Sequence, residues 1–175
     1  IGLINDQSAY SNKPGTFGRF GNLAENGCGV IAMHNANQLL GYNIPFDEFY
    51  YEMRKYNSLV VNLGGSLGMN PDVIGLYNNI GADVTRYNIP NDVSKDHDAY
   101  IALLVHSSGA HYVAAKYKDE SDNFIIYNLY QDSEKPTEVN NLSTKDLKRY
   151  FLLTVWGIDS VDTYGTGSAS AAQSE

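Results

Sequence analysis

The hydrophobic pattern of the chain changes at Gly81, from helical spacing before this glycine to short strand-like runs after it. The first half contains three candidate helices, over 28–40, 46–56 and 71–80. The second half contains five candidate strands, over 83–87, 99–106, 111–118, 124–128 and 151–158. It also contains a short candidate helix after Ser143, which is spaced from Asp146 as in a capping box. Helices followed by strands are typical of an α+β fold.

These elements predict one domain with two lobes, because a chain of 175 residues can bury a sizeable core. We expect this domain to cover 1–163, with a helical lobe over roughly 1–82 and an antiparallel, β-rich lobe over roughly 83–163. The remaining residues, 164–175, are poor in large apolar side chains and rich in Gly, Ser and Ala. Such a composition predicts a flexible tail.

The charge of the chain excludes one class of partner. The formal net charge is -8, and the basic residues form no cluster larger than Lys148 and Arg149. A nucleic-acid backbone would therefore be repelled. No apolar run approaches the ~20 residues of a membrane-spanning helix. The chain begins with Ile1 rather than Met, which fits removal of a leader and a secreted or cell-envelope location, with a cytoplasmic location as the alternative.

The single cysteine lies at a predicted helix start. One cysteine cannot form an internal disulfide or a multi-cysteine metal site. In the stretch NGCGVIAMHNANQLLG, Cys28 stands between Gly27 and Gly29. The unpaired N–H groups and the positive dipole end of a helix start favour the thiolate, and the glycines leave room for a substrate carbonyl. The alternative is a small buried side chain that fills the core.

Four histidines are candidates for the base that a thiol nucleophile needs. His34 follows the cysteine by six residues, a rotation of roughly 240° on a helix, and points away from it. His97 lies in the polar segment SKDHD, where we expect it to be solvated. His106 and His111 bracket the SSGA segment. We favour His111, because Gly109 permits close backbone approach and the strand after it would hold the imidazole, and keep His106 as the alternative base.

A catalytic histidine also needs an acceptor that orients its ring. The segment HYVAAKYKDESDNFIIYN predicts a hairpin that turns over 119–122. Pairing Lys118 with Asn123 would make Asn128 the diagonal neighbour of His111, within reach of its side chain. Asp132 has the same parity and is the reserve acceptor beyond the strand end. The alternative for Asn128 is a strand-end residue that bonds to its own backbone.

The order of these residues resembles the papain-like cysteine peptidase superfamily. Cys28 opens a helix in the first half, and His111 and Asn128 stand on paired strands in the second. The stretches NGCGVIAMHNANQLLG, HYVAAKY and IIYN are most similar to small bacterial peptidases related to bacteriocin-leader-processing domains, over roughly residues 20–158. The resemblance implies a papain-like fold and a Cys-His-Asn triad.

The resemblance implies two further elements of a site. The family places a Gln six residues before the cysteine as an oxyanion donor, and Asn22 stands at that position with the same amide on a shorter stem. The segment NLGGSLG, with Gly64 and Gly65, resembles the glycine loop that offers backbone hydrogen bonds to an extended peptide. An ordinary connection between elements is the alternative for this segment.

The predicted function is hydrolysis of peptide bonds in a peptide or protein substrate, through an acyl-enzyme on Cys28. The sequence has no phosphate loop and no clustered ligand set, so we expect no nucleotide, metal or prosthetic group. The same residues would also serve an acyltransferase, in which an amine accepts the acyl group. A catalytically inactive binding module of the same fold is the third possibility.

Overall fold

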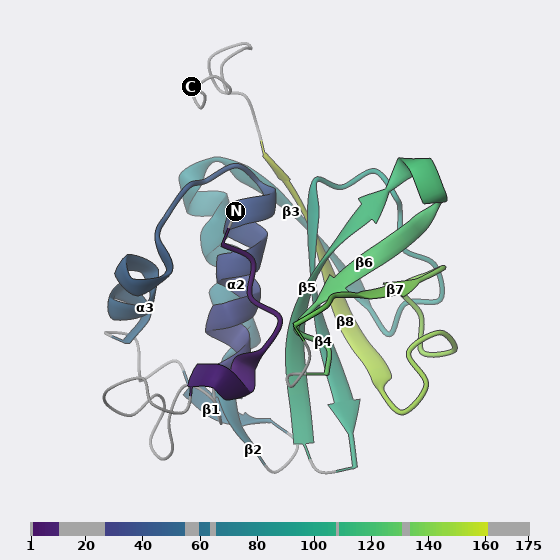
Figure 1. The fold of residues 1–175 in the computed structure, drawn as a ribbon, viewed down its shortest axis with the longest axis horizontal. Coiled ribbons are helices and arrows are strands. Elements are labelled where there is room, and N and C mark those ends of the chain that lie inside the picture. Colours follow the sequence, from purple (N-terminus) through teal and green to yellow (C-terminus); the bar gives the residue numbers. More distant parts are fainter. Residues whose placement is uncertain are drawn as a thin grey trace.

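The structure is a computed structural model that describes residues 2–10, 27–54, 60–63, 66–107, 109–130 and 134–160. A six-stranded antiparallel sheet forms its larger part, and the main helices gather on one side of this sheet (Figure 1). The predicted α+β fold is therefore confirmed. Among the described residues, no helix is long and apolar enough to cross a membrane.

The central helix, α2, spans Cys28–Leu39 and begins at the cysteine as predicted. Its side chains are buried from Cys28 to Asn37, because the helix is covered on several sides. The sheet lies on one side of it, α3 (Phe46–Arg54) on another, and the 3-10 helix η3 (Pro71–Ile80) shares its core. Gly41 follows the helix in a left-handed conformation (φ 83°), which only glycine adopts at little cost.

The third predicted helix is a 3-10 helix rather than an α-helix. Asn70 caps its start through its side chain, and Gly81 ends it in the left-handed conformation, both as the sequence predicts. Its interior contains the β-branched pair Val73 and Ile74 followed by Gly75. These three residues have low α-helix propensity, which explains the tighter and less regular geometry.

The order of strands in the main sheet is β3-β8-β4-β5-β6-β7, and all neighbours pair antiparallel. The five predicted strands are present, with shifts of one or two residues at some ends. The strands are β3 (Ala82–Asn88), β4 (Ala99–His106), β5 (Gly109–Lys118), β6 (Asn123–Tyr127), β7 (Thr137–Val139) and β8 (Phe151–Ser160).

Several short elements were not predicted. They are η1 (Gln7–Tyr10), the hairpin of β1 (Val60–Leu63) and β2 (Ser66–Met69), η4 (Asp119–Ser121) and the edge strand β7. Conversely, the helix predicted after Ser143 is a run of turns. The Asp146 N–H does donate to the Ser143 hydroxyl at 3.3 Å, but Lys148 has a φ of 58° and interrupts any right-handed helix.

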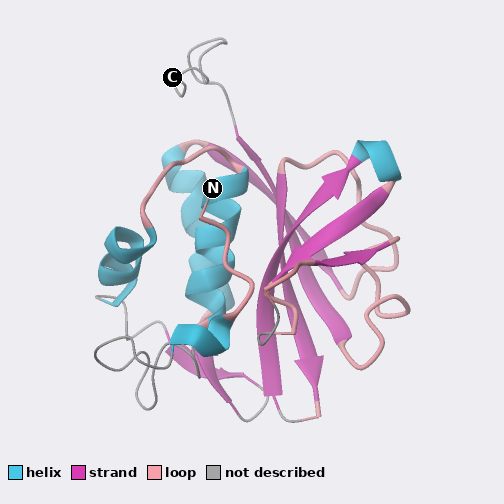
Figure 2. Cartoon of the chain, viewed as in Figure 1, coloured by secondary structure: helices cyan, strands magenta, loops and turns pink. Residues whose placement is uncertain are grey.

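Helices lie over one face of the sheet and loops over the other (Figure 2). Each face carries its own apolar core. On one face, α2, α3 and η3 pack against β-strand side chains such as Ile101, Tyr112 and Trp156. On the other face, the chain between β6 and β8 folds back and contributes Leu142 and Leu147 to the core. Both sides of the central strands are therefore buried, which fixes β4 and β5 firmly.

The hairpin of β5 and β6 has the predicted register. Lys118 pairs with Asn123, and the pairing continues as far as Ala114 opposite Tyr127. Because β6 ends there, the first half of β5, from Gly109 to Val113, extends past the end of β6. The start of α2 lies against this overhanging stretch of β5.

Candidate active site

The start of α2 presents unpaired backbone N–H groups to the cysteine. Gly27 is the N-cap, and it makes no side-chain hydrogen bond to the helix. The first N–H groups of a helix have no partner within the helix. Those of Cys28 and Gly29 are close enough to the sulfur to lower the pKa of the Cys28 thiol. A glycine cap thus leaves these donors to the sulfur, where a Ser or Asp cap would compete for neighbouring N–H groups.

Gly29 has a packing role that the sequence did not reveal. A Cβ atom at this position would lie 2.6 Å from the Cβ of Met69 in β2, so only glycine fits. The backbone oxygen of Met69 also accepts a hydrogen bond of 2.8 Å from the Tyr112 hydroxyl. Met69 therefore joins the start of α2 to β5 and fixes the position of Cys28 relative to that strand.

The protonation of Cys28 differs from the sequence prediction. The thiol is buried, and burial raises its pKa. Hydrogen bonds from the N–H groups of Tyr112, Gly29 and Cys28 itself lower the pKa, but burial outweighs them. The helix start therefore does not produce a thiolate at neutral pH in this conformation, and the expectation of one was wrong.

His111 lies in the overhanging stretch of β5 and is 1% exposed. Its Nε2 is 2.7 Å from the backbone oxygen of Asn128. A carbonyl can only accept, so Nε2 carries the proton and Nδ1 is the basic nitrogen of the neutral ring. The pKa of His111 is lowered to about 4. Burial is the largest cause and neighbouring His106 lowers the pKa further, while the bond to Asn128 acts in the opposite direction. The imidazole is therefore neutral at pH 7.

The structure brings Cys28 to the strand segment that contains His111. Cys28 packs in the same apolar core as Tyr112, the residue that follows His111 in β5. Tyr112 packs in the core with α2, whereas the His111 ring lies 6.4 Å from the ring of Tyr150 in the core of the opposite face. Cys28 and His111 thus lie on either side of the β5 backbone, at the end that extends past β6.

Asn128 lies next to His111 as predicted, but different atoms make the contact. The sequence predicted that the Asn128 side chain would bond to the imidazole. In the structure the backbone oxygen of Asn128 does so, and the side-chain amide pairs with Gln7. The reason is that the chain leaves the sheet here: Asn128 has a φ of 63°, a left-handed conformation that turns its carbonyl toward the ring.

The other three histidines have structural partners. His106 is half-buried, and its ring is 5.6 Å from that of Tyr150, which places it near His111. His34 is buried away from the cysteine, as predicted, with Nε2 2.6 Å from the backbone oxygen of Gly2. Of the histidines, His111 is the one next in the chain to Tyr112, which packs in the same core as Cys28.

The prediction that His97 is solvated was wrong. Its side chain is 9% exposed. The Nδ1–H group donates to Asp159 at 2.8 Å, and Nε2 is hydrogen-bonded to the Tyr87 hydroxyl at 2.6 Å. The ring also lies against Gly157, where a Cβ atom would be 2.3 Å from it. His97 therefore ties the loop before β4 to the edge strand β3 and to its neighbour β8, away from the cysteine.

Four of the predicted site residues lie outside the described residues. They are Asn22, the predicted oxyanion donor, Gly64 and Gly65, the predicted substrate-binding glycines, and Asp132, the reserve acceptor. The predicted tail over 164–175 also lies outside them. The roles of these residues stay predictions.

Gln7 is a site residue that sequence reasoning missed. Its side chain is 1% exposed, and its amide oxygen accepts from Asn128 at 2.9 Å. The two residues are 121 positions apart in the chain. Gln7 lies in no motif and in no periodic hydrophobic pattern. The sequence therefore offered no signal for this contact.

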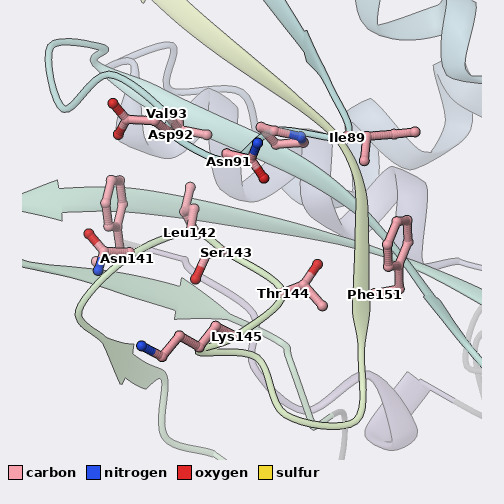
Figure 3. A pocket seen from close by; sticks show the side chains of 12 residues that line it. Ile89, Asn91, Asp92, Val93, Asn141, Leu142, Ser143, Thr144, Lys145 and Phe151 are labelled. Carbon is pink, nitrogen blue, oxygen red and sulfur yellow. The ribbon is translucent and has the colours of Figure 1, made fainter.

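A pocket of about 420 Å³ lies elsewhere on the sheet, between the loop after β3 and the segment before β8 (Figure 3). Its lining includes Asn91, Ser143, Lys145 and the half-exposed Phe151. None of Cys28, His111 and Asn128 lines it. This pocket is therefore separate from the candidate active site.

Comparison with protein-family models and with curated proteins found no match to this sequence. The site itself contains a buried thiol at a helix start, and a buried neutral imidazole with a fixed proton position on the adjacent strand.

Proposed function

We propose that this protein is a cysteine peptidase of the papain-like type, with Cys28 as nucleophile and His111 as base. One observation carries the proposal: Cys28, at the start of α2, packs in the same core as Tyr112, and the residue before Tyr112 is a histidine whose Nε2–H is held by a backbone carbonyl. In a neutral histidine held in this way, Nδ1 is the basic nitrogen. A nucleophile, a base and a group that orients the base are the parts that covalent acyl transfer needs.

The proposed reaction starts from a neutral pair. Cys28 and His111 lie on either side of the β5 backbone, so the proposal requires the two side chains to approach each other at the end of β5 that extends past β6. As the Cys28 sulfur then attacks a peptide carbonyl, its proton moves to Nδ1 of His111. The C–S bond forms, and the negative charge develops on the carbonyl oxygen. The N–H groups at the start of α2 are preorganised donors for this charge. Burial of the site strengthens each of these interactions, because water does not screen them.

Collapse of the intermediate completes the first half of the reaction. The C–N bond breaks, and the proton on Nδ1 of His111 moves to the leaving amine. Water then attacks the thioester, His111 accepts a proton from it, and the thiol of Cys28 is released with a proton from His111. The Asn128 carbonyl keeps Nε2–H in place throughout and stabilises the imidazolium through its dipole.

The fold order supports the same assignment. The nucleophile opens the central helix, the base lies on β5, and its partner Asn128 directly follows β6, which pairs with β5 in the predicted register. This is the arrangement that the resemblance to papain-like peptidases implies. The substrate is proposed to be an extended or unfolded polypeptide.

The test is cleavage of a broad library of unfolded peptides by the reduced protein, read by mass spectrometry. We expect new peptide termini with the wild-type protein and none with Cys28→Ala. His111→Gln should lower the rate by a factor of about 10² or more. His106→Gln is the matched control, because it changes the histidine next to the same tyrosine, and it should retain most of the rate.

Two outcomes would contradict the proposal. If an excess of amine gives amide products in preference to hydrolysis, the protein is an acyltransferase. Absence of any product with every library member would leave a binding module of the same fold. A loss with His106→Gln as large as that with His111→Gln would move the role of base to His106.

A further inference from the structure

The N-terminal segment, residues 2–10, connects α2 to the candidate active site. In Figure 1 it runs along α2 toward the end where that helix begins. Near its start the His34 ring donates to the backbone oxygen of Gly2 at 2.6 Å. The side chain of Asn35 then bonds to both backbone groups of Ile4, at 2.7 and 2.8 Å. This half of the segment is thus attached to α2.

The second half of the segment is attached to Asn128. The backbone N–H of Asn128 donates to the side chain of Asn5 at 3.1 Å. Its side-chain amide forms a pair with Gln7: the Gln7 backbone N–H donates to Oδ1 at 3.1 Å, and Nδ2 donates to the Gln7 side chain at 2.9 Å. Gln7 and Asn128 are both almost fully buried, at 1% and 2% exposure.

These three hydrogen bonds act on a residue in an uncommon conformation. A φ of 63° is rare outside glycine, although asparagine adopts it more readily than most residues. The bonds hold Asn128 on its N–H side and at its side chain, and the direction of its carbonyl follows. That carbonyl is the acceptor for Nε2 of His111. Ordering of Asn128 therefore passes directly to the imidazole.

We propose that Gln7 and Asn5 are positioning residues for His111. By fixing Asn128, they keep its carbonyl hydrogen-bonded to Nε2–H of the imidazole. The proton therefore stays on Nε2, and Nδ1 is the nitrogen that acts as the base. The inference rests on the proposed role of His111 as the base toward Cys28. It assigns the first residues of the chain to the site, although they lie more than a hundred positions from His111.

The test reads the proton position on His111 directly. Protein with ¹⁵N-labelled histidine is studied by NMR at pH 7 without substrate, and the His111 signals are assigned by their loss in His111→Gln. We expect a protonated Nε2 and an unprotonated Nδ1 in the wild type. In Gln7→Met, which keeps the length of the side chain but removes the acceptor, and in Asn5→Ala, both tautomers should appear.

Asn35→Leu is the matched control. It removes two buried hydrogen bonds of the same segment, those to Ile4, and leaves every bond of Asn128 in place. It should keep the single wild-type tautomer even where it lowers the unfolding midpoint as much as Gln7→Met does. With a cleaved peptide, Gln7→Met should lower kcat roughly tenfold or more and change KM much less, because orientation of the base matters in the transition state.

The inference is overturned if both Gln7→Met and Asn5→Ala keep the Nε2–H tautomer alone, or if Asn35→Leu mixes the tautomers to the same extent. Should Gln7→Met fail to fold, the smaller change Asn5→Ala decides the question. Because the tautomer is read without substrate, a protein that cleaves no peptide can still support or overturn the inference. Its failure is thereby distinguishable from failure of the proposed function.

Discussion

At the scale of single residues, burial acts on the two ionisable groups of the site in opposite directions. It raises the pKa of the Cys28 thiol and lowers that of the His111 imidazole, because in each case the charged form loses hydration. Both groups are therefore neutral at pH 7. Such a pair works by proton transfer during attack, as a hydroxyl nucleophile does, rather than from a preformed thiolate.

This state makes a prediction for alkylation of Cys28 by iodoacetamide. The rate should rise with pH toward a midpoint above the ~8.5 of a free cysteine, and it should be slow at pH 6. A short cysteine peptide in the same buffers is the control. His111→Phe should move the midpoint little. A midpoint below pH 7 that His111→Phe abolishes would show a thiolate–imidazolium pair, as the sequence alone had suggested.

A second residue-scale prediction separates the two parts of Asn128. Asn128→Gly and Asn128→Ala both remove the amide that pairs with Gln7, and both keep the carbonyl that binds His111. An alanine at this position must also adopt a φ of 63°, which destabilises the folded state by on the order of 1–2 kcal/mol, whereas glycine adopts this φ without that cost. Peptide turnover and stability should therefore suffer more in Asn128→Ala. Equal losses in the two variants would assign the effect to the amide alone.

At the scale of elements, the site depends on how closely α2 approaches β2. The missing Cβ of Gly29 lets the Met69 side chain pack against the helix start, where an added Cβ atom would lie 2.6 Å from the Cβ of Met69. Close-packed interiors tolerate such an overlap poorly, because neither a helix start nor a strand can yield without moving its neighbours. The position of Cys28 at β5 follows from this contact.

Gly29→Ala should therefore destabilise the protein by about 1–3 kcal/mol, read from urea unfolding. Gly75→Ala is the matched control, because a Cβ there meets nothing within 4 Å; it should be neutral or slightly stabilising. The Gly29 variant should also alter Cys28 alkylation, whereas the Gly75 variant should not. Similar unfolding midpoints for the two variants would mean that the α2–β2 contact adapts more easily than its geometry indicates.

The same scale shows which elements a sequence can reveal. Strand β4 and the start of α2 were predicted because their side chains follow a clear period and end at turns or glycines. The hairpin of β1 and β2 and the edge strand β7 were missed, since each is three or four residues long and has little periodic signal. The turns after Ser143 begin with the predicted capping contact, but Lys148 adopts a positive φ that prevents a helix. No local sequence pattern predicts this conformation for a lysine.

At the scale of the whole molecule, the candidate site draws on three distant parts of the chain. The pattern of helices and strands located Cys28, His111 and Asn128, because each stands at the start or end of a predicted element. It could not supply Gln7, whose bond to Asn128 spans 121 positions, nor the protonation of the pair, which depends on how deeply the finished fold buries it. Both are properties of the assembled structure.

Buried neutral histidines should also limit the stability of the whole fold in acid. The pKa values of His111, at about 4, and of His34 are lowered by burial relative to the usual 6.5. Below pH 6.5 the unfolded chain therefore takes up protons that the folded chain does not. The free energy of unfolding should be highest above pH 6.5 and fall toward pH 4, with His111 contributing roughly 3 kcal/mol to the loss.

The measurement is urea unfolding between pH 4 and pH 7.5 for the wild type and His111→Phe. The phenyl ring fills the same space but cannot take up a proton, so the variant should lose less stability on acidification, whatever its stability at pH 7. Comparing the slopes, rather than the absolute values, cancels the effect of altered packing and of the carboxylates that both proteins share. Identical slopes would mean that His111 titrates in the folded protein as it does in the unfolded chain. The imidazole would then be mostly protonated near pH 6, and the neutral pair from which the proposed proton transfer starts would be the minor form there.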